Sequence, residues 1–187
     1  MKAIIPLAGF GKRLRPHTYT KPKPLIPVAG KAVLGHILDK LIGMDIEEIV
    51  FVVGYLGDQI RDYVESTYDF PACFVEQQEL KGQAHAIHLA KEHMSGPVLI
   101  VFVDTIFETD ISVLSQEPSD GVIYVKEVED PRRFGVVITE NGLITKLVEK
   151  PSTPVSNLAV IGLYYIKDSQ MLMDSIAELI EKDIKTK

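Results

Sequence analysis

The stretch that decides the fold is Lys2-Ala3-Ile4-Ile5-Pro6-Leu7-Ala8-Gly9-Phe10-Gly11-Lys12-Arg13-Leu14-Arg15-Pro16. It passes from a short apolar run to two glycines and then to basic residues. The apolar run does not alternate with polar residues, which is typical of a strand covered on both faces of its sheet. The glycines let backbone N–H groups approach an anion closely, and the basic residues can hold its charge. Taken alone, the stretch also fits a strand-to-turn junction with solvated basic side chains.

Two familiar phosphate-binding motifs do not match this stretch. A Walker loop ends in Gly-Lys followed by Ser or Thr, and the dinucleotide fingerprint needs a third glycine where Leu14 stands. The sequence therefore predicts a glycine-containing phosphate loop of another kind.

The same strand type recurs farther along the chain, with helical patterns between the strands. Apolar runs lie at residues 48–53, 98–103 and 121–125, and apolar stripes at helical spacing lie at residues 33–42, 58–66 and 83–92. This rhythm of strands and helices implies right-handed crossovers. The prediction is an α/β fold, a Rossmann-like three-layer αβα sandwich with a mixed, mostly parallel sheet.

The pattern changes after residue 120. Runs at residues 134–139 and 143–148 flank Asn141-Gly142, a strong hairpin signal, and residues 158–166 form another predicted strand. Ser169 is a candidate cap for a final helix, whose inward face would carry Leu172, Ile176, Leu179 and Ile180. An antiparallel portion is therefore expected beside the parallel one.

Composition narrows the class of protein. The chain has 187 residues and a formal net charge of -6, which fits one globular domain over 1–187 and argues against a nucleic-acid binder. No signal peptide or membrane span is expected. Cys73 is the single cysteine, so neither an intrachain disulfide nor a thiolate-based zinc site is expected. These features favour a cytoplasmic protein.

A second informative stretch is Lys21-Pro22-Lys23-Pro24-Leu25-Ile26-Pro27-Val28. Proline fixes φ and restricts the residue before it, so Lys23 is expected to project from a stiff, extended segment. The stretch alone also fits a rigid loop without a catalytic role.

Together these two stretches resemble the amino-terminal signature of the sugar-1-phosphate nucleotidylyltransferases, a family that includes the glucose-1-phosphate thymidylyltransferases. Further matches follow in order at residues 82–86, 102–107, 130–137, 148–151 and 156–164. The resemblance implies transfer of a nucleotidyl group to a sugar 1-phosphate with release of pyrophosphate. It favours dTTP or UTP as the nucleotide and glucose 1-phosphate as the sugar.

The resemblance also assigns residues to the nucleotide. Arg13 would steady the departing pyrophosphate, and Lys23 would contact the α-phosphate as its charge develops. Gln77 would read the base, with Gln78 as the alternative. The other implied nucleotide-binding residues are Leu7, Ala8, Gly9, Gly11 and Gly82.

On the sugar side, the resemblance implies that Glu149 and Lys150 meet the sugar and its phosphate, in the antiparallel portion. Gly135, Asn157 and Tyr164 would line the sugar pocket. No covalent nucleophile is needed, because positioning and charge stabilisation carry this type of reaction. His85 and His88 are interpreted as helix-surface or pocket-wall residues rather than metal ligands.

Asp104 follows the apolar run at residues 98–103, at the strand end where α/β sheets bind ligands. It is therefore the expected Mg²⁺ ligand. The sequence departs from the family pattern at Val103, where the family usually has glycine, so a narrower approach for the nucleoside is expected. The family's second acidic metal ligand comes from a carboxyl-terminal segment that has no match before Lys187. The expectation is a truncated domain, a metal site completed by another group, or a chain that binds without turnover.

Two alternatives remain open. The first is a catalytically incomplete relative that acts as a nucleotide- or sugar-nucleotide-binding module. The second is a cytidylyl- or guanylyltransferase acting on another phosphorylated substrate. The resemblance is also compatible with a homo-oligomer.

Overall fold

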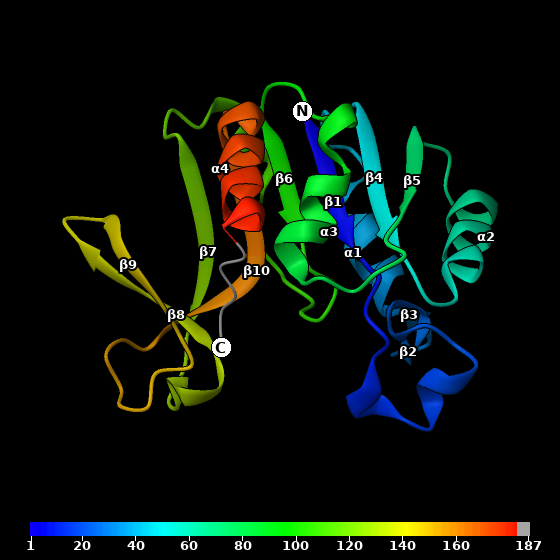
Figure 1. Cartoon of the computed structure of the whole chain (residues 1–187), viewed down its shortest axis with the longest axis horizontal. Helices are drawn as coiled ribbons and strands as arrows, with labels where there is room; N and C mark the ends of the chain where they lie inside the picture. The colour runs from blue at the N-terminus through cyan, green and yellow to red at the C-terminus, as the bar shows by residue number, and fades with distance from the viewer. Residues whose placement is uncertain (183–187) are drawn as a thin grey trace.

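The computed structural model describes residues 1–182 and is built on one large mixed sheet (Figure 1). Its parallel half has the order β5-β4-β1-β6. These strands are β1 (Lys2–Pro6), β4 (Glu48–Val53), β5 (Ala72–Glu76) and β6 (Val98–Val101). Ala3 of β1 pairs with Ile49 on one side and with Leu99 on the other. The predicted parallel pairing is confirmed.

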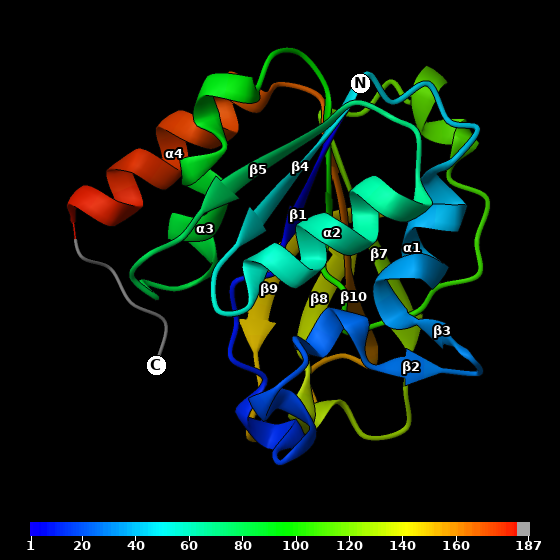
Figure 2. The same ribbon diagram turned by 90° about the vertical axis from the view of Figure 1, so that its right-hand side faces the viewer.

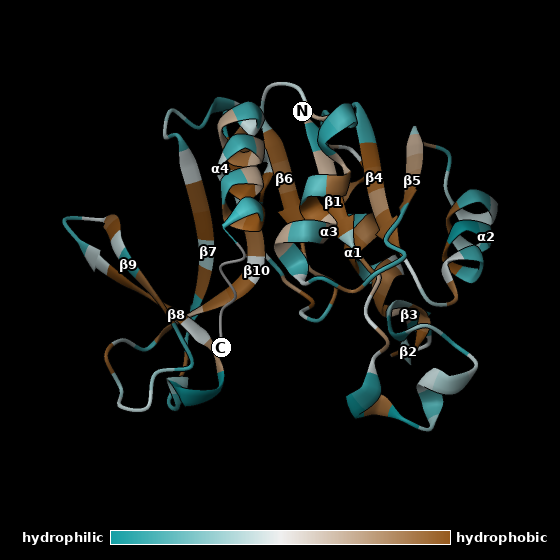
Figure 3. Ribbon diagram, in the orientation of Figure 1, coloured by the Kyte–Doolittle hydropathy of each residue, from teal (hydrophilic) through white to brown (hydrophobic). Residues whose placement is uncertain are grey.

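Helices cover both faces of this half. They are α1 (Val33–Leu41), α2 (Gly57–Thr67), α3 (Gln83–Leu89) and α4 (Ser169–Glu181). Figure 2 shows α3 and α4 on one side of the strands and α1 and α2 on the other. Neighbouring residues of β1 accordingly enter different cores: Ile5 packs with Leu34 and Ile60, whereas Ile4 packs with Ala86 and Met173. The three-layer αβα sandwich is confirmed, and the apolar strands lie at its centre (Figure 3).

The antiparallel half is organised by β10. Its strands are β7 (Gly121–Glu127), β8 (Gly135–Glu140), β9 (Leu143–Glu149) and β10 (Leu158–Ile166). β10 pairs antiparallel with β6, β7 and β8 and so joins the two halves. The Asn141-Gly142 turn has φ of 51° and 79°, the conformation that the hairpin prediction requires. The β8–β9 hairpin extends away from the layered body (Figure 1).

A bulge in β10 lies where the two halves meet. The register against β7 shifts between Val160 and Tyr164. Gly162 lies in the bulge with φ of 80°, and a Cβ there would approach Phe102 Cβ to 2.9 Å. Glycine is therefore required by both backbone conformation and space.

Several predicted boundaries are wrong. β6 ends at Val101 rather than at 103, opposite the bulge of β10, where Phe102 N–H donates to Gly162 O (2.8 Å). The helix predicted at 83–92 is α3 followed by a separate 3₁₀ turn, Lys91–His93. The edge strand β5 and a small hairpin of β2 (Pro27–Val28) and β3 (Lys31–Ala32) were not predicted.

The last helix also differs from its prediction. Its cap is Asp168, whose carboxylate accepts hydrogen bonds from Gln170 N–H and Met171 N–H, whereas Ser169 is the buried first helical residue. Of the four predicted inward residues, Ile176 is buried and Leu172 packs against the same cluster, whereas Leu179 and Ile180 are 39% and 38% exposed. Met173, which was not predicted, is also buried. Among residues 1–182, no helix combines the length and apolar character needed to cross a membrane.

Candidate active site

A cavity of about 560 Å³ opens at the carboxyl ends of the parallel strands. All nine residues predicted to bind the nucleotide or to act on its phosphates line it: Leu7, Ala8, Gly9, Gly11, Arg13, Lys23, Gln77, Gly82 and Asp104. They come from four separate segments of the chain. Parallel strands place their carboxyl ends at one edge, which is why the fold brings these segments together.

The glycine loop forms the floor of the cavity. Leu7 N–H donates to Val52 O (2.7 Å), which fixes where the loop leaves the sheet. Gly11 has φ of 61°, and a Cβ there would lie 2.9 Å from Thr18 Cγ2. At Gly9 a Cβ would meet nothing within 4 Å. Gly11 is therefore needed for the turn itself, whereas Gly9 leaves space over the backbone for a ligand.

Lys23 lies beside a carboxylate in the cavity lining. Its Nζ is 3.7 Å from Asp104 Oδ2, and the two side chains are 37% and 60% exposed. Such an exposed pair is weak, because water screens it, so a phosphate or a cation can replace either partner. The predicted extended segment is wrong in detail, since Lys23–Leu25 forms a 3₁₀ turn. Pro22 before it is extended, and Pro24 occupies a turn position compatible with its fixed φ.

Gln77 is held in a defined orientation at the cavity wall. It is 4% exposed, and its Nε2 donates to Gly82 O (3.3 Å) and lies 2.9 Å from His85 Nδ1. When the His85 ring carries its proton on Nε2, its Nδ1 accepts the second amide hydrogen, and Oε1 is then the group left to accept a hydrogen bond from a ligand. Gln78, the alternative, is exposed and does not line the cavity.

The predicted sugar-side residues lie outside the cavity lining, around the β8–β9 hairpin. Gly135 pairs with Glu149 in the hairpin register, and a Cβ on Gly135 would lie 3.0 Å from Glu149 Oε2. Lys150 Nζ donates to Glu149 Oε1 (2.5 Å), and Asn157 Nδ2 donates to Glu127 Oε1 (2.6 Å). The structure therefore brings Gly135, Glu149 and Lys150 together, whereas Asn157 contacts a different carboxylate.

Tyr164 connects the two groups of residues. Its ring packs edge-on against Phe102, which lines the cavity, at 6.0 Å between centroids. Burial raises the pKa of the Tyr164 hydroxyl, and the negative charges of Glu149 and Asp104 raise it further. The hydroxyl therefore stays protonated at neutral pH and can donate a hydrogen bond in a region that two carboxylates face.

Some cavity residues were not predicted as site residues. Phe102, Leu80 and Ala86 contribute apolar walls, and Val103 lines the cavity while its side chain packs mainly into the core. His85, predicted to be a wall or surface residue, contacts the amide of the buried Gln77. The positions of these residues in the sequence could have indicated that they belong to the site, because they lie close to Gly82 or Asp104.

Comparison with known proteins is consistent with this geometry. Residues 2–186 match the family model of the nucleotidyl transferases. The bifunctional protein GlmU of Methanocaldococcus jannaschii is 39% identical over 184 residues, which are 97% of this chain and 42% of that protein. The UTP–glucose-1-phosphate uridylyltransferase AglF of Haloferax volcanii is 35% identical over 172 residues, covering 88% of this chain and 71% of that protein.

A solved structure has the same architecture. A crystal structure assigned as a glucose-1-phosphate thymidylyltransferase from Bacillus anthracis, in complex with a sucrose, has a TM-score of 0.84 and 29% identity. The match covers 100% of this chain and 76% of that one. The chain thus spans less than half of the GlmU protein and about three quarters of this solved structure.

Proposed function

The chain belongs to the nucleotidyl transferase family, and from this premise we propose that it transfers a nucleotidyl group from UTP or dTTP to glucose 1-phosphate, releasing pyrophosphate. The observation that carries the proposal is the cavity in which the glycine loop, Lys23 and Asp104 meet at the carboxyl ends of the strands. A triphosphate needs both backbone N–H groups and cationic side chains, and this edge of the sheet offers both.

In this reaction an oxygen of the sugar phosphate attacks the α-phosphorus of the nucleotide. A new P–O bond forms, the bond to the β-phosphate bridging oxygen breaks, and pyrophosphate leaves with the electron pair. Lys23 would neutralise charge at the α-phosphate, and Arg13 would hold the departing pyrophosphate. No protein nucleophile is required, so positioning and electrostatics supply the rate enhancement.

Asp104 fits the chemistry of a Mg²⁺ ligand. Its carboxylate is exposed, projects from the strand-end loop beside the cavity, and is engaged only by a weak pair with Lys23 among residues 1–182. A bound Mg²⁺ would neutralise phosphate oxygens. Lys23 would then exchange its contact with Asp104 for one with the α-phosphate.

The orientation of Gln77 supports the choice of base. Uracil and thymine present an N3–H donor, whereas the same position of cytosine is an acceptor. With His85 in the tautomer that accepts from Gln77, Oε1 is the free group of the amide, which matches the N3–H of uracil or thymine and leaves cytosine unpaired. Guanine also presents a ring N–H, so this hydrogen bond alone does not separate guanine from uracil or thymine. The choice of a pyrimidine is supported by the similarity to AglF, whose name specifies UTP and glucose 1-phosphate.

The test is pyrophosphate release in the presence of Mg²⁺ and glucose 1-phosphate, with UTP, dTTP, CTP, GTP and ATP supplied in turn. Release with UTP or dTTP is expected. Release only with CTP or GTP would replace the proposal with the cytidylyl- or guanylyltransferase alternative. Nucleotide binding without release from any of the five would favour a binding module.

A further inference from the structure

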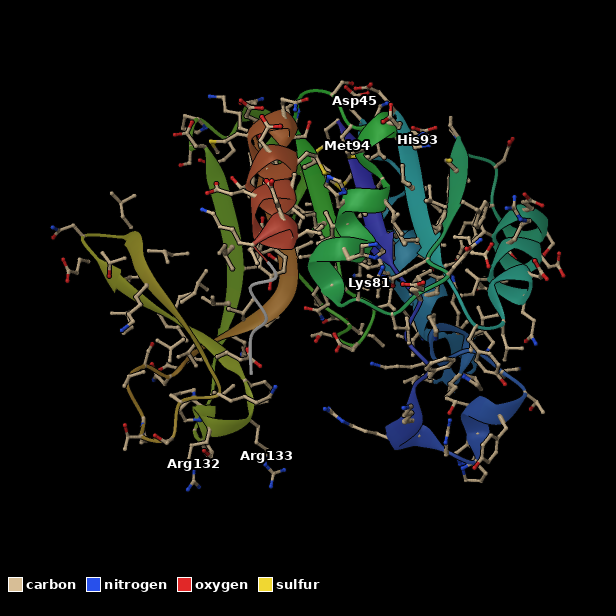
Figure 4. All side chains as sticks on the ribbon, in the orientation of Figure 1. Asp45, Lys81, His93, Met94, Arg132 and Arg133 are labelled. Carbon is tan, nitrogen blue, oxygen red and sulfur yellow. The ribbon has the colours of Figure 1, made fainter. Side chains whose placement is uncertain are left out.

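Three side chains that can ligate a metal converge at the opposite end of the sheet from the cavity. Glu48 is the first residue of β4, Cys73 is the second residue of β5, and His93 ends the 3₁₀ turn after α3. The parallel strands begin at this edge, close to the amino terminus, and Figure 4 labels His93 there. The cluster is therefore separate from the candidate active site.

The three side-chain ends lie close enough to reach a single ion. Cys73 Sγ lies 3.3 Å from His93 Nε2, whereas Glu48 Oε2 lies 3.5 Å from the other ring nitrogen, Nδ1. One ligand atom from each of the three residues lies within 4.8 Å of the other two. Ligand atoms around a tetrahedral Zn²⁺ are about 3.3–3.7 Å apart, given metal–ligand distances of about 2.0–2.3 Å. Because one ion takes only one ring nitrogen, the His93 ring or the Glu48 side chain has to rotate so that one nitrogen, Cys73 Sγ and a Glu48 oxygen surround the ion.

The types of ligand select the kind of metal. A thiolate and an imidazole favour Zn²⁺ and Co²⁺, whereas Mg²⁺ and Ca²⁺ prefer sites made of oxygen ligands. All three residues are half-buried, so the ion would be partly shielded while a fourth position stays open to water. The sequence, with its single cysteine, does not predict a zinc site. The fold brings a histidine and a glutamate to that cysteine.

We propose that Glu48, Cys73 and His93 bind one thiophilic divalent cation of the Zn²⁺ class. The ion would join β4, β5 and the segment that follows α3. The other end of α3 begins at Gln83, which lines the nucleotide cavity together with Gly82 and Ala86. The expected consequence is greater stability of the segment that supports one wall of the cavity, because a ligand that binds only the folded state stabilises it.

A bound cation has to displace the thiol proton of Cys73 and compete with the ammonium group of Lys2. Burial raises the pKa of the Cys73 thiol, and the charge of Glu48 raises it further, so metal binding has to release a proton. Lys2 Nζ lies 3.5 Å from Glu48 Oε2 and donates to His93 O (2.6 Å). Its ammonium competes with the cation for the carboxylate, and its removal is expected to tighten binding.

The test is titration with Co²⁺, monitored through thiolate-to-cobalt charge-transfer absorption. Because Cys73 is the only cysteine, this absorption reports this site alone, and Co²⁺ at the oxygen ligands of the cavity does not produce it. Saturation at one Co²⁺ per chain is expected, followed by loss of the band when Zn²⁺ is added. The absence of a charge-transfer band at excess Co²⁺ would overturn the proposal.

Substitutions distinguish a site with three ligands from Co²⁺ binding by the Cys73 thiolate alone. His93→Ala and Glu48→Gln are each expected to weaken Co²⁺ binding at least tenfold, and Lys2→Met is expected to strengthen it. His88→Ala is the matched control, because His88 lies on α3 outside the cluster and should leave the titration unchanged. Circular dichroism without metal checks that each variant is folded. A band of equal affinity in His93→Ala and the unmodified chain would contradict the three-ligand site.

Discussion

The two halves of the sheet differ in how much of their strands is buried. In the parallel half, five of the six residues of β4 are buried. In the antiparallel half, six of the seven residues of β9 are exposed. The nucleotide residues accordingly line one cavity, whereas the predicted sugar residues lie on and around an open hairpin. The difference indicates that the nucleotide half is preorganised by its core, while the sugar half depends on few packing contacts.

The largest expected effect is on stability and uses a leucine from each half. Leu99 of β6 is fully buried, whereas Leu147 of β9 is 57% exposed. Leu99→Ala should lower the free energy of unfolding by about 2–5 kcal/mol through lost burial and a cavity, and Leu147→Ala should change it by less than about 0.5 kcal/mol. Urea denaturation of both variants measures the contrast. Equal losses would show that the exposed face of β9 is covered in solution.

The next effect concerns the chemistry of the cavity. Lys23→Ala should lower kcat by about 10²–10³-fold, because the developing charge at the α-phosphate loses its cation. Nucleotide affinity should change only a few-fold. Steady-state kinetics and equilibrium titration separate the two quantities. Lys21→Ala is the matched control, since Lys21 is exposed and does not line the cavity. A parallel loss of affinity and kcat in Lys23→Ala would contradict its transition-state role.

A smaller effect is expected on base selection. Gln77→Leu should weaken UTP binding by about 1–3 kcal/mol, because the N3–H of uracil would be desolvated without an acceptor. CTP binding should change little, so discrimination between the two bases should fall. Titration of both nucleotides measures this. Gln78→Leu serves as the control, and discrimination that persists in Gln77→Leu would show that another group reads the base.

The smallest effect lies in the antiparallel half. Hydrogen bonds from the Arg132 side chain and backbone hold the pKa of Asp130 at about 2, below its usual 3.8. A lowered pKa contributes stability above 3.8 that is lost as pH falls toward 2. Asp130→Asn keeps a capping side chain but removes the charge. The urea midpoint of the unmodified chain should exceed that of the variant slightly near neutral pH, and the gap should shrink in acid. A gap independent of pH would exclude the charge as its cause.

Much of the parallel half could be predicted from the sequence, because its strands are continuous apolar runs with helical stripes between them. The pairing of β10 with three other strands could not be predicted, since it depends on contacts distant in sequence. β5 was missed because its run, Ala72–Glu76, is short and only partly buried at the edge of the sheet. The cap of α4 was misplaced by one residue, because Asp168 and Ser169 are both good capping residues.

The candidate site was predictable where it follows strand ends. The glycine loop, Lys23, Gln77 and Asp104 were named from sequence and share one cavity. The contact between Gln77 and His85 depends on how the loop after β5 folds, and no local pattern encodes it. The convergence of Glu48, Cys73 and His93 likewise requires the strand order, since these residues are widely separated in sequence.

The claim that the nucleotide half is preorganised and the sugar half is not is tested most directly by calorimetric titration of the chain with each substrate alone. The account predicts that UTP with Mg²⁺ binds without glucose 1-phosphate and binds at least about tenfold more tightly than CTP. It also predicts that glucose 1-phosphate binds measurably only when the nucleotide site is filled. Tight binding of glucose 1-phosphate to the free chain, or equal binding of UTP and CTP, would contradict it.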